Sequence, residues 1–148
     1  MRISLSGNAA MNAPVDKTFK FATTISQVGV CIPNVQDFKQ LDGKNFTMNV
    51  VTGVAFIKGT FAVKGALTEQ GENHVAYSVE WKGVGSTIKV NLSFNMSPKI
   101  NGYTDVAWTA DAEMSGLISG VSESVLRKVT EEKIEEIVAN VKARLEKS

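Results

Sequence analysis

The sequence predicts an α+β fold in which a curved antiparallel β-sheet wraps around a long C-terminal α-helix. Three observations lead to this fold class. Apolar and polar residues alternate with a period of two from about residue 35 to residue 113. Apolar residues recur at helical spacing over the last thirty residues. Between the first short strand and the long strand-rich region, the pattern predicts two short helices.

The N-terminal part contains the first strand and these two helices. Ile3 and Leu5 alternate with polar neighbours, as in a half-buried strand. A helix is expected from Pro14, because Pro is favoured in a first turn and apolar residues follow at helical spacing. Residues 23–30 suggest a second short helical or irregular piece. Pro33 then disfavours helix at Ile32, so the chain should become extended there.

The strands that follow each present one apolar face. The alternating apolar or small residues are Phe46, Met48 and Val50; Ala55, Ile57, Gly59, Phe61, Val63, Gly65 and Leu67; Val75, Tyr77, Val79 and Trp81; Ile88, Val90, Leu92, Phe94 and Met96; and Thr104, Val106, Trp108, Ala110 and Ala112. Turn-forming residues occur at 41–44, 70–73, 83–85 and 101–102. Short loops and a period of two predict an antiparallel meander with one buried face.

The C-terminal segment supplies the cover for that face. The helical stripe consists of Leu117, Val121, Val125, Val129, Ile134, Val138, Val141 and Leu145. At roughly thirty residues, such a helix would be about 45 Å long, enough to cross the sheet. Gly116 and Gly120 near its start suggest a bend or a close approach to the sheet. A long amphipathic helix held in a curved sheet is the helix-grip arrangement.

Length and composition fit one globular domain over residues 1–148. The chain is 43% hydrophobic and 21% charged, with a formal net charge of +1. This balance argues against a nucleic-acid-binding protein, which usually has a strongly basic face. The sequence has neither a signal-peptide core nor an apolar run long enough to span a bilayer. We therefore expect a cytoplasmic protein without a transmembrane segment, for which peripheral membrane contact stays open.

Few residues are candidates for catalysis or metal binding. His74 is the single histidine and is expected in a solvated turn. Cys31 is the single cysteine, which excludes an intrachain disulfide and a cysteine-based metal cluster. We interpret it as a small apolar residue beside Pro33. Alternation places Asp105, Asp111 and Glu113 on the wet side of the sheet. We accordingly expect no catalytic residues, no metal site and no cofactor.

The inward face is the more informative part of the sequence. Glycine inside a strand commonly marks a bend or close approach, and Gly59 and Gly65 lie on one face. We expect a sheet bent around the helix, with space for a ligand between them. The residues predicted to line this space are Phe46, Met48, Phe61, Tyr77, Trp81, Leu92, Trp108, Met114, Leu117, Val121 and Val125. Such a mostly apolar lining with a few polar atoms is typical of small-molecule sites.

Four segments in the same order resemble a known family. They are 31–34 (Cys-Ile-Pro-Asn), the glycine-rich strand 53–61, the hairpin 83–86 and the junction 108–116. The sequence resembles the family of carbon monoxide dehydrogenase G subunits, within the START/polyketide-cyclase-like (SRPBCC) superfamily, over nearly its whole length. In the first segment Asn34 replaces the family's usual Gly. Asn tolerates a left-handed backbone, so the turn is expected to persist.

The resemblance implies a non-catalytic accessory protein that binds a hydrophobic molecule. Members are linked with molybdenum-containing dehydrogenases, with their recruitment to membranes and with quinone binding. Longer members carry a linker and an apolar tail, whereas this sequence ends at Ser148 directly after Lys147. The resemblance therefore implies binding rather than anchoring.

Three functional hypotheses follow. The first is a binding protein for a quinone or other lipid that acts with a carbon monoxide dehydrogenase-type oxidoreductase. The second is a cyclase- or hydrolase-like enzyme, which would need a polar cluster in the cavity. The third is a protein-interaction module with a solid core, which would show native packing density and no internal space.

Overall fold

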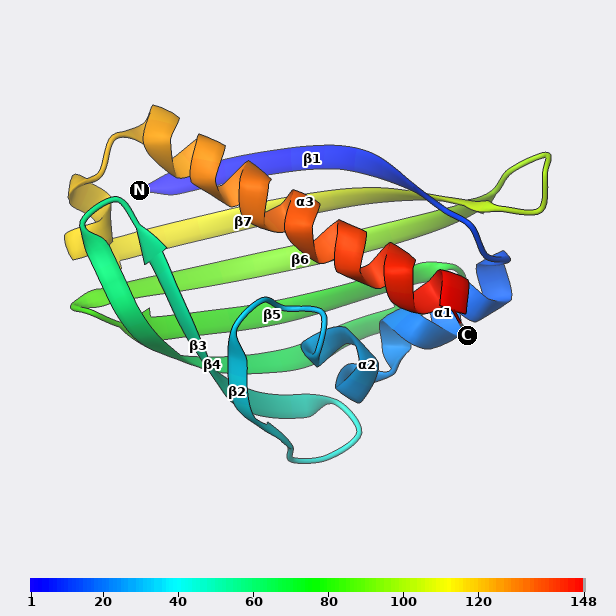
Figure 1. Ribbon diagram of the computed structural model, residues 1–148, viewed down its shortest axis with the longest axis horizontal. Helices are drawn as coiled ribbons and strands as arrows, with labels where there is room; N and C mark the ends of the chain where they lie inside the picture. Colours follow the sequence, from blue (N-terminus) through cyan, green and yellow to red (C-terminus); the bar gives the residue numbers. More distant parts are fainter. Residues whose placement is uncertain (148) are drawn as a thin grey trace.

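The computed structural model describes residues 1–147, which form a curved sheet with three helices over one of its faces (Figure 1). In chain order the elements are β1 (Arg2–Met11), α1 (Val15–Thr23), α2 (Ile25–Gly29), β2 (Val35–Gln40), β3 (Asn45–Val54), β4 (Ile57–Gly71), β5 (His74–Gly83), β6 (Ser86–Pro98), β7 (Thr104–Gly116), the 3-10 helix η1 (Leu117–Gly120) and α3 (Glu123–Lys147).

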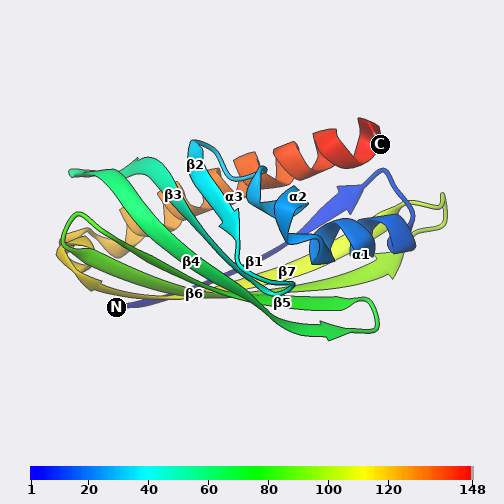
Figure 2. The ribbon, with the colours of Figure 1, turned by 90° about the horizontal axis from the view of Figure 1, so that it is seen from below.

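Within these residues the strands form one antiparallel sheet in the order β1-β7-β6-β5-β4-β3-β2. From β2 to β7 each strand pairs with the next in sequence, and β1 closes the order by pairing with β7. Figure 2 shows α1, α2 and α3 on the same side of the sheet, while the opposite side carries no helix. The predicted fold class, a curved antiparallel sheet with a long C-terminal helix and two short helices after the first strand, is confirmed.

The register separates an apolar inner face from a charged outer face. One inner row crosses the sheet through Leu67, Tyr77, Leu92, Ala110 and Leu5. All five side chains point toward the helices, because successive residues of a strand alternate between the two faces. Burial of this face by α1, α2 and α3 explains the period-two pattern of the sequence.

The outer face carries alternating charges in the corresponding positions. Its matching row runs through Lys64, Glu80, Lys89, Glu113 and Arg2, so each cation stands beside an anion on the next strand. Opposite charges in directly paired positions stabilise a sheet, whereas like charges would destabilise it. The charged residues keep this face in contact with solvent, so the opposite, apolar face is the one that packs against the helices.

Buried hydroxyl groups attach α1 to the sheet. Thr104 is fully buried and donates a hydrogen bond to the carbonyl oxygen of Ala13 at 2.7 Å. Thr18 of α1 donates to the carbonyl oxygen of Pro14 at 3.0 Å and lies 3.4 Å from the Thr104 hydroxyl. An unpaired buried hydroxyl is costly. These bonds therefore fix the start of α1 beside Thr104, the first residue of β7.

Helix α3 is held firmly at its two ends. Leu126 and Leu145 are both only 1% exposed. The Arg127 side chain donates to the carbonyl oxygen of Ser4 on β1 at 3.1 Å. The Asn140 side chain donates to the carbonyl oxygen of Cys31, between α2 and β2, at 2.8 Å. One flank of α3 therefore faces β1, and the other faces the α2–β2 connection.

Two predicted boundaries are wrong. The α-helix begins at Glu123 instead of near Leu117, so its 25 residues span about 37 Å. Residues 117–120 form η1, because Gly116 ends β7 in a backbone conformation (φ 84°) that favours glycine. The predicted long strand face at Ala55 is instead a tight turn between β3 and β4, with Ala55 at φ 53°.

In the described residues, no helix is both long enough and apolar enough to cross a bilayer.

Candidate functional site

Part of the inner face, on β1, β6 and β7, is only half-buried, although the helices lie on this side of the sheet. Leu5 of β1, Val90 and Phe94 of β6, and Trp108 of β7 are half-buried and pack against the fully buried core. A core filled at native density would bury such large apolar side chains completely. The middle of the inner face is therefore less tightly covered than its ends.

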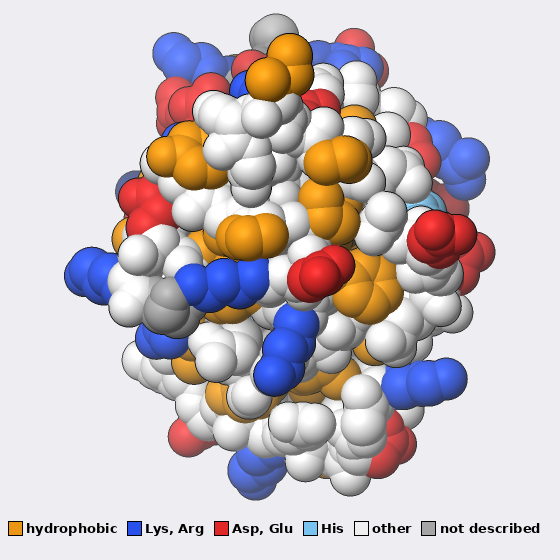
Figure 3. Space-filling view, turned by 90° about the vertical axis from the view of Figure 1, so that its right-hand side faces the viewer, with side chains coloured by type: hydrophobic (Ala, Val, Ile, Leu, Met, Phe, Trp, Pro, Cys, Tyr) orange, Lys and Arg blue, Asp and Glu red, His pale blue; other side chains and the backbone are white. Residues whose placement is uncertain are grey.

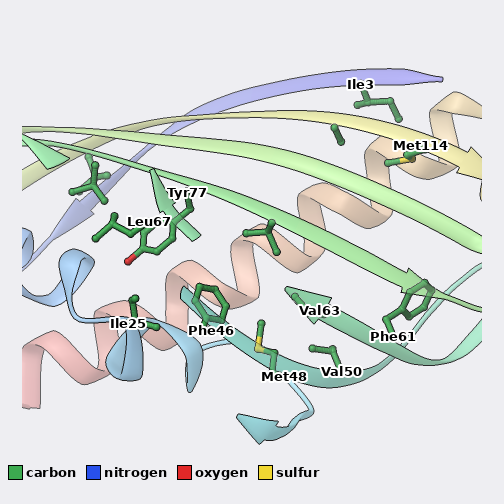
Figure 4. Packing of buried hydrophobic residues seen from close by; sticks show 14 of the residues in the cluster. Ile3, Ile25, Phe46, Met48, Val50, Phe61, Val63, Leu67, Tyr77 and Met114 are labelled. Atoms are coloured by element: carbon green, nitrogen blue, oxygen red, sulfur yellow. The ribbon is translucent and has the colours of Figure 1, made fainter. Parts of the chain in front are cut away.

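At each of its two ends the inner face carries an aromatic cluster of buried and half-buried side chains. At one end Phe46 stacks on Phe38 and meets Tyr77 edge to face, with ring centroids 5.7 and 6.5 Å apart, respectively. Figure 4 shows Tyr77, Leu67 and Phe46 together near Ile25, with Phe61 farther along the sheet. At the other end Phe61 meets Trp81 edge to face at 6.4 Å. Aromatic pairs of this geometry are stabilising beyond their burial alone.

Gly65 does not leave room for a ligand, contrary to the prediction. A Cβ atom at Gly65 would lie 2.1 Å from the Phe46 ring, so this ring fills the position. The sequence signal was correct in identifying a close approach, but the approaching group is a side chain of this protein. Half-buried apolar side chains of the inner face lie instead on β1, β5, β6 and β7.

Two indole rings lie on this half-buried inner face. Trp81 and Trp108 lie on the inner face, and the Trp108 ring passes over Gly7 of the edge strand β1. No residue within 1–147 accepts a hydrogen bond from either indole, and no buried side-chain nitrogen in that range lacks a partner. Both N–H groups are therefore open to solvent and can donate to another molecule.

The Tyr77 hydroxyl is already used within the protein. It donates a short hydrogen bond to the carbonyl oxygen of Ala22 at the end of α1. Burial raises the pKa of Tyr77, so this phenol stays protonated. Its role in the structure is to attach α1 to β5.

The core-facing side of α3 keeps the C-terminal part of the predicted stripe, because Val138 and Val141 pack against the core and Leu145 is buried. It also includes residues that the prediction left out. Leu126, Thr130, Lys133, Ile137 and Val141 recur at spacings of three and four, which places them on one side of the helix. Leu126 is fully buried, and the other four are half-buried. The middle of α3, like the sheet beneath it, is only partly covered.

The residues predicted from sequence to line the site fall into three groups. Six are buried in the core: Phe46, Met48, Phe61, Tyr77, Met114 and Val121. Three are half-buried on the inner face: Trp81, Leu92 and Trp108. Two point to solvent: Leu117, at 57% exposed, and Val125, at 40% exposed.

Leu117 and Val125 were misplaced because the predicted helix began too early. Leu117 belongs to η1, and its backbone N–H donates to the carbonyl oxygen of Gly85 at 3.0 Å. Val125 lies in the first turn of α3, next to the buried Leu126. Of the helix residues in the predicted site, only Val121 is buried, and it lies between η1 and α3.

Several half-buried residues were not included in the predicted site. Leu5, Ile88, Val90 and Phe94 share the inner face with Trp81 and Trp108. Their alternation was visible in the sequence, but nothing there separated half-buried from fully buried positions.

The titratable candidates lie away from the inner face. Asp105, Asp111 and Glu113 on the outer face contact Asn8, Ser4 and Arg2 of β1. In the described residues, no group of three or more His, Cys, Asp or Glu side chains gathers as a metal site would require.

Cys31 and His74 have structural partners. Cys31 is fully buried, and its thiol donates to the carbonyl oxygen of Gln27 at 3.4 Å. Burial raises the pKa of this thiol, although the nearby Arg144 opposes the shift, so the weakly nucleophilic thiol form is favoured. The His74 ring bridges Glu69 and Asn95 at 2.9 and 2.8 Å.

The end of the molecule that carries α1 has a mixed surface. In Figure 3 its apolar side chains form separate patches, divided by charged and polar groups. Separate apolar patches of this kind are usual for protein surfaces. The inner face is therefore the stronger candidate site.

Comparison with solved structures places the fold among START-like proteins. A conserved protein from Geobacillus kaustophilus superposes with a TM-score of 0.90 at 16% identity, covering 99% of this chain and 97% of that one. A START superfamily protein from Mycobacterium smegmatis gives 0.75 at 14% identity, covering 97% of each chain. The ZhuI aromatase/cyclase from Streptomyces sp. R1128 gives 0.70 at 12% identity, covering 99% and 94%.

No curated protein matches the sequence significantly. Likeness to the solved structures shows the fold alone, because all three identities are low. The family model of CoxG, the G subunit of carbon monoxide dehydrogenase, matches residues 7–146, nearly the whole chain. The resemblance of the four sequence segments is thereby confirmed, and the chain belongs to the CoxG family of carbon monoxide dehydrogenase G subunits.

Proposed function

We propose that this protein binds a hydrophobic small molecule, a quinone or another lipid, between α3 and the inner face of β1, β5, β6 and β7. The observation that carries the proposal is the half-buried state of Leu5, Val90, Phe94 and Trp108 beneath an equally half-buried helix. A bound apolar molecule would remove this surface from water, at about 25 cal/mol for each Å². That gain is enough for micromolar binding without a charged anchor.

The proposed site includes Trp81, Leu92 and Trp108 from the sequence prediction, with Leu5, Ile88, Val90 and Phe94 added. Phe46, Met48, Phe61, Tyr77, Met114 and Val121 support it from the core, and Leu117 and Val125 lie outside it.

We propose a carrier or accessory role rather than catalysis. The acidic side chains of β7 lie on the outer face, and the Tyr77 hydroxyl is bonded to Ala22. The inner face of the described sheet thus offers no pair of titratable groups for general acid–base chemistry. Membership of the CoxG family supports a partner of the carbon monoxide dehydrogenase type.

Intrinsic fluorescence tests the proposal directly, because the only two tryptophans both face the proposed site. The protein is titrated with a short-chain quinone, and a quinone that enters beside Trp81 and Trp108 should quench their emission to saturation. Native mass spectrometry of the same samples should show one bound molecule. Unchanged emission and an apo mass at saturating quinone and lipid would overturn the proposal.

A matched pair of variants locates the binding. Val90→Phe adds bulk to the inner face, while Lys89→Phe adds the same ring to the outer face at the neighbouring residue. We expect Val90→Phe to weaken binding at least about tenfold, because the new ring occupies ligand space. Lys89→Phe should leave affinity unchanged. Equal effects of the two variants would place the ligand elsewhere.

A further inference from the structure

We propose that one end of the molecule docks on an anionic lipid surface through three exposed apolar side chains, Phe56, Val84 and Leu117. We call these three residues the apolar tip. The inference goes beyond the proposed function, because it concerns a second surface and needs no bound ligand. It is carried by the clustering of the three side chains, by their exposure on turns, and by the charge around them.

Three connections that are distant in the sequence meet at this end of the molecule. They are the β3–β4 turn, the β5–β6 turn and η1 after β7, and Figures 1 and 2 both show them at the same end. A Cβ atom at Gly59, near the start of β4, would lie 3.0 Å from the Val84 side chain. A Cβ atom at Gly85 would lie 2.9 Å from the Leu117 side chain. The three connections therefore form one continuous surface.

The apolar tip is exposed at a cost to the folded state. Phe56 is 69% exposed, Leu117 57% and Val84 37%. Val84 also has φ 50°, which is strained for a β-branched residue, and Gly or Asn would form such a turn more easily. Because neither the exposure nor the backbone favours folding, contact with another surface accounts better for these side chains.

The charge around the apolar tip is positive. Segments 51–60, 81–88 and 114–122 contain no Asp or Glu but include Lys58 and Lys82. The acids that flank these segments each pair with a cation at 3.3 to 3.8 Å: Glu80 with Lys82, Glu113 with Arg2, and Glu123 with Arg127. Lys58 is exposed and makes no ion pair within residues 1–147. An anionic surface would complement this lysine beside Phe56.

A lipid surface fits this combination better than a protein surface. Apolar side chains can enter the boundary between head groups and acyl chains while neighbouring lysines meet anionic head groups. Three side chains on separate turns are few for a protein interface, which takes about 20–30 residues from each partner. The proposed ligand site begins behind the apolar tip, because Trp81 pairs with Ile88 at the base of the β5–β6 turn. Docking here would bring that end of the site to the bilayer.

Vesicle flotation tests the inference with the full chain and without quinone. We expect the protein to float with vesicles of phosphatidylcholine mixed with phosphatidylglycerol. Binding to phosphatidylcholine alone should be about fivefold weaker, because one lysine near an anionic surface contributes that much. Lys58→Gln should reduce this preference to less than about twofold. Lys99→Gln, in the β6–β7 turn, should keep it in full.

A second matched pair assigns the docking to the apolar tip. Phe56→Ser should weaken binding to the mixed vesicles at least about tenfold, because it removes the largest apolar group of the tip. Ile100→Ser is the control, since Ile100 is even more exposed than Phe56. Ile100 lies in the β6–β7 turn, at the opposite end of the molecule (Figure 1). Its substitution should leave binding unchanged.

Added tryptophans report directly on contact with lipid. Phe56→Trp should lose emission with vesicles of brominated phosphatidylcholine and phosphatidylglycerol, relative to the natural protein. Ile100→Trp should not. This pair also decides the question if Phe56→Ser does not fold, as judged by circular dichroism. Quenching of both variants alike, or of neither, overturns the inference.

The outcomes separate the inference from the proposed function. Absence of flotation with the mixed vesicles, or equal losses in Phe56→Ser and Ile100→Ser, overturns the inference and leaves quinone binding standing. Flotation of a protein that binds neither quinone nor lipid monomers overturns the proposed function alone. Self-association without flotation, abolished by Phe56→Ser in sedimentation experiments, would assign the apolar tip to a second copy of the chain and also overturns the inference.

Discussion

His74 shows how a single side chain gains a structural role from its register. Both ring nitrogens face oxygen atoms, Nε2 that of Glu69 at 2.9 Å and Nδ1 that of Asn95 at 2.8 Å. A protonated ring can donate to both at once, whereas a neutral ring can donate to only one. The hydrogen bond to Glu69, followed by that to Asn95, raises the pKa of His74 above 6.5.

This pKa shift predicts a pH-dependent contribution to stability. Folding favours the protonated ring, so the stabilisation is complete below the unfolded pKa of about 6.5 and is lost as pH rises through the folded pKa. Proton NMR should give a His74 pKa above 6.5 in the folded protein. Glu69→Gln should lower that value and weaken the fall of the unfolding free energy with pH in this window.

Glu72→Gln provides the matched control for Glu69→Gln. Glu72 lies in the turn before His74 and is exposed. It makes no contact with the ring within the described chain. A pKa shift of equal size in both variants would show that general charge, rather than the bond to Glu69, controls His74.

At the residue scale, the sequence indicated the neighbourhood of His74 but not its partners. A solvated turn was predicted, and the residue does open β5 at the turn. Glu69 reaches the ring because the β4–β5 register shifts by one residue between Leu67 and Glu69. Such an irregularity depends on the packing of both strands, and no residue type in the sequence marks it.

Among the elements, the junction between β7 and α3 is the most constrained. Gly116 has φ 84°, and a Cβ atom there would lie 2.2 Å from the backbone carbonyl oxygen of Gly85. That oxygen is fixed by the N–H of Leu117 at 3.0 Å. Backbone atoms cannot move aside as a flexible side chain would, so a larger residue must distort the junction.

We therefore expect Gly116→Ala to lower the free energy of unfolding by more than about 2 kcal/mol. Gly120→Ala is the control, because a Cβ atom at Gly120 meets nothing within 4 Å. It should change stability by less than about 0.5 kcal/mol. Urea denaturation measures both values. A similar small effect of the two substitutions would mean that the junction relaxes without cost.

The strands could be predicted from the sequence, and the start of the long helix could not. Alternation of apolar and polar residues directly reflects the two faces of one sheet, so five strand faces were recognised. Leu117, Val121 and Val125 also match helical spacing, but Gly116 and Gly120 interrupt the helix before Glu123. The β3–β4 turn was missed because Ala55 and Phe56, instead of Gly or Asn, form it.

At the scale of the whole molecule, the candidate site depends on where two elements fail to pack closely. The sequence identified which residues face inward, including Trp81, Leu92 and Trp108. It could not separate the filled part of the core around Phe46 from the half-buried part around Val90. That difference depends on how α3 lies over the sheet, which is set by the hydrogen bonds of Arg127 to Ser4 and of Asn140 to Cys31. Both bonds join residues more than one hundred positions apart, and such contacts leave no local pattern in the sequence.

A ligand between α3 and the sheet should therefore stabilise the whole fold. A ligand that binds only the folded state at one hundred times its dissociation constant adds about 2.7 kcal/mol to the unfolding free energy. For a chain of this size the melting temperature should rise by about 5–10 °C. Scanning calorimetry with dodecanoate or a short-chain quinone measures the rise, which should grow with the logarithm of ligand concentration.

Hydrogen exchange shows where the added stability arises. Without ligand, amides in the half-buried middle of α3, around Thr130 to Ile137, should exchange faster than those of the fully covered strand β4. Ligand should slow the helix amides most, because it fills the space that leaves them half-buried. Val90→Phe should slow them without ligand and reduce the thermal shift, while Lys89→Phe should do neither. Protection that appears only on the outer face would refute binding beneath α3.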